Sequence, residues 1–177
     1  MTYQKHLDIL TSGSRLWNIW RRDHSDLQAF EPDLHGADLH QVHLRGIDFH
    51  GADLTEADLR HADLSEADLR EADLRHANLQ GADLSDAHLQ KARLRGANLG
   101  GAKLCRTNLQ GADLSHADLR GADLLGTDLK KALLDGVQFD ETKAPTKVFH
   151  EMDLRKHLEA QEQEQRVASV ALHAAAA

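Results

Sequence analysis

The feature that most constrains this chain is an unbroken five-residue period between residues 32 and 140. Every fifth residue from Leu34 to Phe139 is large and apolar, and of these 22 positions 20 are Leu and two are Phe. The residue two places before each of them is mostly Ala. The repeat unit is therefore Ala-Asp/Asn-Leu followed by two variable residues, and so short a period has to be interpreted before helices and strands are assigned.

Neither regular element accommodates this period. A helix would spread the Leu side chains around its surface, and a strand would place successive Leu residues on opposite faces. A chain that turns a corner every five residues keeps Leu and Ala inside and the other three residues outside. If four repeats complete one square coil, residues twenty apart stack and their backbone groups bond neighbouring coils. The repeat run then gives about five and a half coils, roughly 26 Å in height.

Glycine and aspartate occupy fixed positions in the repeat. Ten of the twelve glycines are the second residue after the central Leu or Phe, a position suited to a corner with positive φ. Asp or Asn directly before the central residue is suited to bond the backbone of a turn. Both placements predict structural roles.

The Ala-Asp/Asn-Leu-x-x repeats resemble those of the pentapeptide-repeat family. The resemblance implies an all-β fold, a right-handed quadrilateral β-helix, which we expect to carry short helical caps at its ends. The expected division is an N-terminal helical cap over 1–31, the β-helix over 32–140, a C-terminal cap over 141–166 and a disordered tail over 167–177. Some members of the family dimerise through a C-terminal segment.

An N-terminal lid is expected because a solenoid exposes unpaired edges at its ends. Ser14 is the expected N-cap of a short helix whose apolar residues cover the first coil. These residues are Leu16, Trp17, Ile19 and Trp20. In the alternative interpretation the tryptophans form an exposed docking site.

The C-terminal segment allows two interpretations. Phe149 and Leu154 keep the five-residue register after Phe139, which favours one or two degenerate repeats over 144–158. A helix that starts near Thr146 and runs towards Arg166 would instead cover the last coil. The candidate dimer or cap contacts are Phe149, Met152, Leu154 and Leu158.

Charge and composition indicate which kinds of partner and which cellular compartment to expect. A net charge of −8 argues against direct binding of nucleic acid or anionic membranes, which requires a basic face, and favours a basic partner. No window approaches the roughly 18 consecutive apolar residues of a membrane span. The N-terminus has no secretory pattern and Cys105 is the only cysteine, so the chain is expected to be cytoplasmic without an intrachain disulfide.

No catalytic, metal-binding or cofactor-binding residues are predicted. Eight of the 13 histidines lie between residues 33 and 140, all at outward positions, and they are expected to be solvated. Catalysis needs a concave pocket, whereas a filled square coil has flat walls. Arg106 beside Cys105 is expected to favour the thiolate modestly, but neighbouring repeats place no histidine base next to this thiol.

Charge is polarised along the repeats. Residues 33–86 carry 13 acidic and 4 basic residues, whereas residues 87–140 carry 6 acidic and 8 basic ones. Residues 87–112 contain no acid, and we call their five cations the basic belt: Lys91, Arg93, Arg95, Lys103 and Arg106. Arg93 and Lys103 stand between Asp residues twenty positions away and are expected to relieve charge repulsion there. Lys91, Arg95 and Arg106 are therefore the candidate partner contacts.

These features predict a rigid, non-catalytic scaffold or interaction module for a protein partner of unknown identity. A homodimer through the C-terminal segment is a second expectation. The alternative from the family resemblance is a mimic of DNA that inhibits or protects DNA gyrase or topoisomerase, which the acidic charge favours and the basic belt weakens. An enzyme acting through histidine or Cys105 is the least favoured class.

Overall fold

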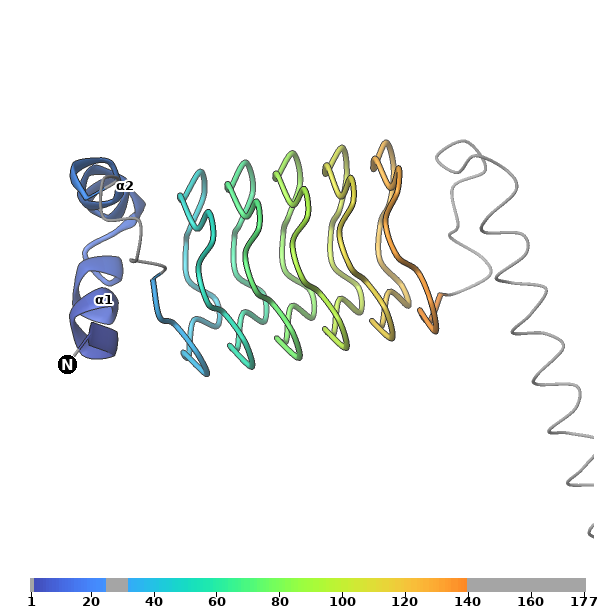
Figure 1. Cartoon of the computed structure of the whole chain (residues 1–177), viewed down its shortest axis with the longest axis horizontal. Coiled ribbons are helices and arrows are strands. Elements are labelled where there is room, and N and C mark those ends of the chain that lie inside the picture. Colours follow the sequence, from blue (N-terminus) through green and yellow to red (C-terminus); the bar gives the residue numbers. More distant parts are fainter. Residues whose placement is uncertain (1, 25–31, 140–177) are drawn as a thin grey trace, which may run out of the picture.

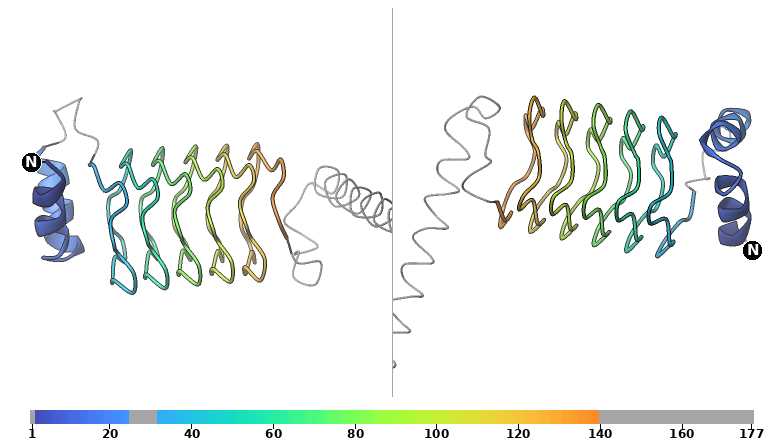
Figure 2. Two further views of the ribbon diagram at one scale, coloured as in Figure 1. Left: turned by 90° about the horizontal axis from the view of Figure 1, so that it is seen from below. Right: turned by 180° about the vertical axis from the view of Figure 1, so that it is seen from behind.

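Residues 2–24 and 32–139 are described by the computed structural model of the chain. Two helices, α1 (Thr2–Leu10) and α2 (Ser14–Asp23), precede a column of stacked coils that begins at residue 32 (Figure 1). Both helices lie at the end of the column where the first coil starts, and the opposite end is reached at residue 139 (Figure 2).

The coils are joined by parallel bridges between residues twenty positions apart, from Asp33↔Asp53 to Asp118↔Gln138. Each bridge is flanked by backbone hydrogen bonds to both neighbouring coils; Asp53 N donates to Pro32 O over 2.9 Å and Leu54 N donates to Asp73 O over 2.8 Å. The strand segments are single bridge residues because a corner follows each one. Four repeats therefore complete one coil, and the predicted β-helix is confirmed.

The interior contains the two residue positions that the period predicts. Central leucines and Phe49 are buried from Leu34 to Leu129, together with the small residues two places before them. Thr107 and Thr127 replace Ala there, and their hydroxyls donate to the carbonyls of Leu84 and Leu104 over 2.7 Å each. Both buried hydroxyls thus have the partner that burial in an apolar core requires.

Every corner bends through a left-handed residue, whether or not that residue is glycine. Gly36 has φ +63° and Glu56, one coil later, has φ +59°. Gly81 has a second role, because a Cβ there would lie 2.5 Å from Nδ1 of His61 on the preceding coil. The corner geometry thus confirms the prediction for glycine, and at Gly81 the absent side chain makes room for a histidine ring.

The N-terminal lid differs in detail from the sequence prediction. The N-cap of α2 is Gly13, with φ +101° and no side-chain capping bond, and Ser14 is the first helical residue. Prediction of Ser14 as the cap was wrong because glycine adopts this backbone conformation without a Cβ clash. Trp17 is fully buried and Trp20 is partly buried against the core, so the tryptophans do not form an exposed docking site. Leu16 and Ile19 are exposed, and the prediction that they cover the first coil was wrong.

Side chains of α2 occupy the hydrogen-bonding positions of a missing coil. Within the column, Asp68 N donates to Ile47 O and Asp68 O accepts from Phe49 N. The equivalent groups of Asp48 on the first coil bond to the lid instead: Asp48 N donates to Asn18 Oδ1 over 2.9 Å, and Asp48 O accepts from Trp17 Nε1 over 2.7 Å. The lid therefore closes the edge that a solenoid would otherwise leave open.

The expected C-terminal cap and tail, 141–166 and 167–177, lie outside the described residues, as do Phe149, Met152, Leu154 and Leu158. The domain boundaries at residues 31 and 140 stay predictions.

Candidate partner-binding surface

Aspartates on the outer walls close the turns of the repeat. The Oδ1 atom of Asp58 accepts from the backbone N of Arg60 over 3.1 Å, and Asp63 accepts likewise from Ser65 over 3.1 Å. This confirms the predicted structural role of Asp before the central Leu. The carboxylates are therefore parts of the wall before they are available to a partner.

Arginine two residues after such an aspartate forms a second, forked contact with it. Arg60 donates from Nε and Nη2 to Asp58 over 2.8 and 2.5 Å. The same Asp-Leu-Arg arrangement pairs three more arginines, Arg70, Arg75 and Arg120, with Asp68, Asp73 and Asp118. Sequence reasoning missed these pairs, although the tripeptide Asp-Leu-Arg was a sufficient signal for them.

Acid is expected to destabilise the walls as these carboxylates protonate. The side-chain hydrogen bond from Arg60 lowers the pKa of Asp58 to about 2, and Arg120 lowers the pKa of Asp118 in the same way. A depressed folded-state pKa stabilises the fold above the unfolded pKa, near 4, and this contribution disappears as pH falls towards 2. Urea unfolding followed by circular dichroism should show a midpoint that decreases over this interval and is steady from pH 5 to 7.

Arg60→Gln is the control for this acid effect. Without the guanidinium the pKa of Asp58 should return towards its ordinary value, and the decrease in midpoint should begin at higher pH. A variant with an unchanged pH profile would contradict the assignment to this pair.

Four residues of the basic belt pair with acids one coil earlier. Arg93 and Lys103 contact Asp73 and Asp83 at 3.4 and 3.0 Å, as expected for charge relief between stacked carboxylates. Lys91 contacts Glu71 at 3.3 Å. Arg106 donates to both carboxylate oxygens of Asp86 over 2.7 and 2.6 Å. The sequence interpretation had left Lys91 and Arg106 without such partners.

Arg95 is different from the other four. It is exposed, and among residues 2–24 and 32–139 it has no side-chain hydrogen bond or ion pair. Of the three candidate contacts, Arg95 is therefore the one whose guanidinium is available without breaking an existing pair. Whether any of the three meets a partner stays a prediction.

The expectation for Cys105 was wrong. Burial and the carboxylate of Asp123 raise the pKa of the Cys105 thiol, and the opposing effect of Arg106 is smaller. Arg106 is directed to Asp86 on the preceding coil, so its charge is already balanced. The thiol is therefore less acidic than an ordinary cysteine, which disfavours a nucleophilic role.

The eight histidines between residues 33 and 140 are exposed, as predicted. One of them, His40, lies with Asp38 and Asp58 in a group whose ligand atoms are within 4.8 Å of one another. His40 Nδ1 bonds Asp38, however, and Asp58 holds the Arg60 guanidinium. A cation there would compete with a resident positive charge, so the group is better explained as a surface ion-pair cluster.

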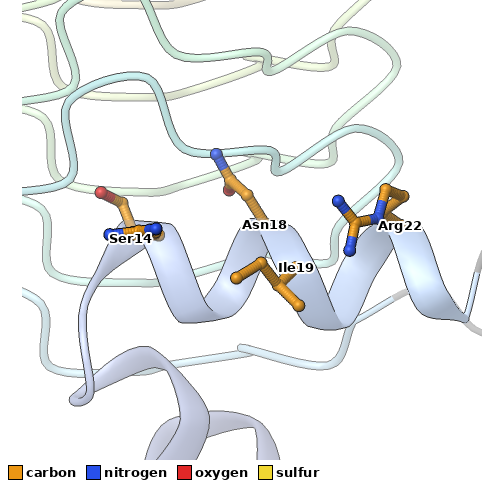
Figure 3. A pocket seen from close by; sticks show the side chains of 5 residues that line it. Ser14, Asn18, Ile19 and Arg22 are labelled. Atoms are coloured by element: carbon orange, nitrogen blue, oxygen red, sulfur yellow. The ribbon is translucent and has the colours of Figure 1, made fainter.

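A shallow hollow along α2 is lined by Ser14, Arg15, Asn18, Ile19 and Arg22 (Figure 3). Asn18 points from the helix towards the first coil, where its Nδ2 donates to Gly46 O over 2.8 Å. The remaining residues lie along one open helix surface. This hollow lacks the enclosed, convergent polar groups of a catalytic pocket.

No helix within the described part of the chain is long and apolar enough to cross a membrane.

A family model described as pentapeptide repeats matches eight copies, over residues 33–70, 67–104 and 97–136. None of the curated proteins matches the chain.

Several solved structures are similar. HetL, a pentapeptide repeat protein involved in heterocyst differentiation regulation from Nostoc sp. strain PCC 7120, is 37% identical with a TM-score of 0.44, covering 62% of this chain and 58% of HetL. This chain therefore spans less than two thirds of HetL. Rfr23 from the cyanobacterium Cyanothece 51142 is 32% identical with a TM-score of 0.41, covering 70% of this chain and 94% of Rfr23. A pentapeptide repeat protein from the Arabidopsis thaliana thylakoid lumen is 27% identical with a TM-score of 0.34, covering 68% of this chain and 73% of that protein.

Proposed function

This chain belongs to the pentapeptide-repeat family, and from that premise we propose that it is a non-catalytic scaffold that presents fixed side chains to a protein partner. The observation that carries the proposal is the filled column. Its interior is occupied by Leu, Ala and a few similar residues, so function has to reside on the walls and ends. Wall side chains are held by hydrogen bonds within repeats and by ion pairs between coils, and such preorganisation reduces the entropy that binding must overcome.

The basic belt is the proposed contact surface, with Lys91, Arg95 and Arg106 as the residues that meet the partner. The coils that precede the belt, residues 33–86, are strongly acidic. Charge therefore changes sign along the axis of the column. Such a distribution orients a charged partner during encounter.

A pull-down from a lysate of the source cells tests this proposal. Wild type is compared with a variant carrying Lys91→Glu, Arg95→Glu and Arg106→Glu, and bound proteins are identified by mass spectrometry. We expect at least one protein to be retained by wild type and lost from the variant. A matched control, Arg60→Glu with Arg70→Glu, alters arginines outside the belt; equal loss from this control would contradict a role for the belt.

The alternative function is mimicry of DNA towards gyrase or topoisomerase, which the 13 acidic residues between positions 33 and 86 favour. A supercoiling assay with purified gyrase separates the two functions. A change in supercoiling by wild type would replace the scaffold proposal with mimicry.

Three finer features belong to the same proposal: a right-handed coil, a homodimer through Phe149, Met152, Leu154 and Leu158, and a cytoplasmic location. Sedimentation of wild type and Phe149→Asp checks the dimer, and cell fractionation checks the compartment.

A further inference from the structure

Arg93 occupies a repeat position that is Asp in most other repeats, and this leaves Arg95 without the carboxylate that pairs with four other arginines at its position. Four arginines of the described walls are the last residue of an Asp-Leu-Arg tripeptide. Each forms a forked ion pair with the aspartate two residues earlier. At residues 93–95 the tripeptide is Arg-Leu-Arg. Arg95 occupies the same outward position as the other four, but the residue that would hold its guanidinium is a second cation.

One coil earlier, the carboxylate of Asp73 is already bonded to two arginines. Both oxygens of Asp73 accept from Arg75, over 2.7 Å to Oδ1 and 2.6 Å to Oδ2, and Oδ2 also accepts from Arg93 over 3.4 Å. The Asp73 side chain is only 16% exposed, so Arg95 has no access to a free lone pair there.

Asp113, one coil later, interacts with Arg95 through charge but not through a hydrogen bond. Hydrogen bonding from Ser115 lowers the pKa of Asp113 first, and the charge of Arg95 adds to that shift. No ion pair joins Arg95 to Asp113 among the described residues. Arg75 and Arg93 are thus both bonded to Asp73, whereas Arg95 has no bonded carboxylate among the described residues.

We propose that Arg95, flanked by Arg93 and Arg75, binds a side-chain carboxylate of an acidic segment in the partner protein. A guanidinium offers a planar fork that matches a carboxylate in two parallel hydrogen bonds. Arg95 is exposed, and an incoming carboxylate would restore the arrangement that Asp provides in the other four repeats. This assignment rests on the proposed scaffold function and names the chemistry of its partner. An acidic segment at the locally positive belt replaces the basic partner that the net charge of −8 favours.

The neighbouring coils select against an extended polyanion such as nucleic acid. Asp53 and Glu56 lie on the same wall two coils before Arg95, and Asp113 and Asp135 lie one and two coils after it. A strand of phosphates would meet these acids on either side, whereas one or two carboxylates fit within the height of the arginine group. The overall charge of −8 acts in the same direction.

Two variants of the full chain separate this site from general electrostatics. Arg95→Ala removes the fork. Arg93→Asp keeps Arg95 but restores the Asp-Leu-Arg tripeptide, so Arg95 should become paired within its own repeat. Arg60→Ala is the matched control, because Arg60 is an exposed arginine of the same tripeptide that already holds Asp58.

The probe is the tetrapeptide acetyl-Gly-Glu-Glu-Gly-amide, titrated at low salt while the arginine Nε–Hε resonances are followed by NMR. We expect the Arg95 resonance to shift, and affinity to fall about fivefold in Arg95→Ala and Arg93→Asp but not in Arg60→Ala. The Gln-Gln peptide should give no shift. Unchanged affinity in Arg95→Ala, or an equal fall in Arg60→Ala, would overturn the assignment.

Inorganic phosphate and a ten-residue oligo-dT are titrated in parallel. Tighter binding of the oligonucleotide than of the Glu peptide at Arg95 would overturn the choice of a protein carboxylate. If Arg93→Asp still captures from lysate the protein that the triple belt variant loses, the scaffold function stands and this site assignment fails. If wild type captures no protein, the scaffold function itself fails.

Discussion

Replacing Trp17 with alanine is expected to lower the free energy of unfolding by about 3–5 kcal/mol. Trp17 is fully buried between the lid and the first coil. Its ring meets the ring of Phe49 edge-on with 5.4 Å between centroids, and the ring of Trp20 lies 5.3 Å away. Truncation removes this packing and leaves Asp48 O without its indole donor, so both a cavity and an unsatisfied carbonyl result.

Urea unfolding of Trp17→Ala and Leu16→Ala, followed by circular dichroism, measures this difference. Leu16 precedes Trp17 on the same helix and is 52% exposed, so its truncation should change stability by less than about 0.5 kcal/mol. An uncovered edge also invites end-to-end stacking, and light scattering during unfolding separates association from loss of stability. Similar stabilities for the two variants would mean that the lid does not stabilise the column.

The sequence predicts the column because its period leaves only one arrangement of Leu and Ala. The inward positions follow from residue spacing, and Thr107 and Thr127 take inward positions that most repeats fill with Ala. Histidines between residues 33 and 140 are exposed at the outward positions that the register assigns to them. Burial in this fold is therefore decided by position in the repeat.

Side-chain pairing was predicted only in part, because the period gives the carboxylates near each cation but not the one that a long side chain reaches. Lys91 and Arg106 pair with acids twenty residues earlier, on the preceding coil; the twenty-residue offset was applied to Arg93 and Lys103 in the sequence prediction but not to these two cations. The raised pKa of Cys105 also depends on contacts between coils, because Asp123 lies on the next coil and Arg106 pairs with Asp86 on the preceding one. The contacts of α2 with the first coil could not be predicted, because α2 lies outside the five-residue period that relates one coil to the next.

Leu124 and Leu125 are adjacent in the chain and provide the sharpest test of register. Leu124 is a central repeat residue and is 3% exposed, whereas Leu125 is 67% exposed on the wall. Leu124→Ala is expected to lower the free energy of unfolding by about 2–5 kcal/mol through the cavity it leaves between stacked leucines.

Leu125→Ala removes the same atoms from a side chain that is largely in water, and its effect should be within about 0.5 kcal/mol. Urea unfolding of both variants under one condition compares identical chemistry at positions that differ only in direction. Because each coil touches only its neighbours, a defect at Leu124 should also weaken the coupling of the last coil to the column, and hydrogen exchange of residues 114–139 should increase more than that of residues 34–69. Equal destabilisation by the two variants would contradict the five-residue register from which the whole column follows.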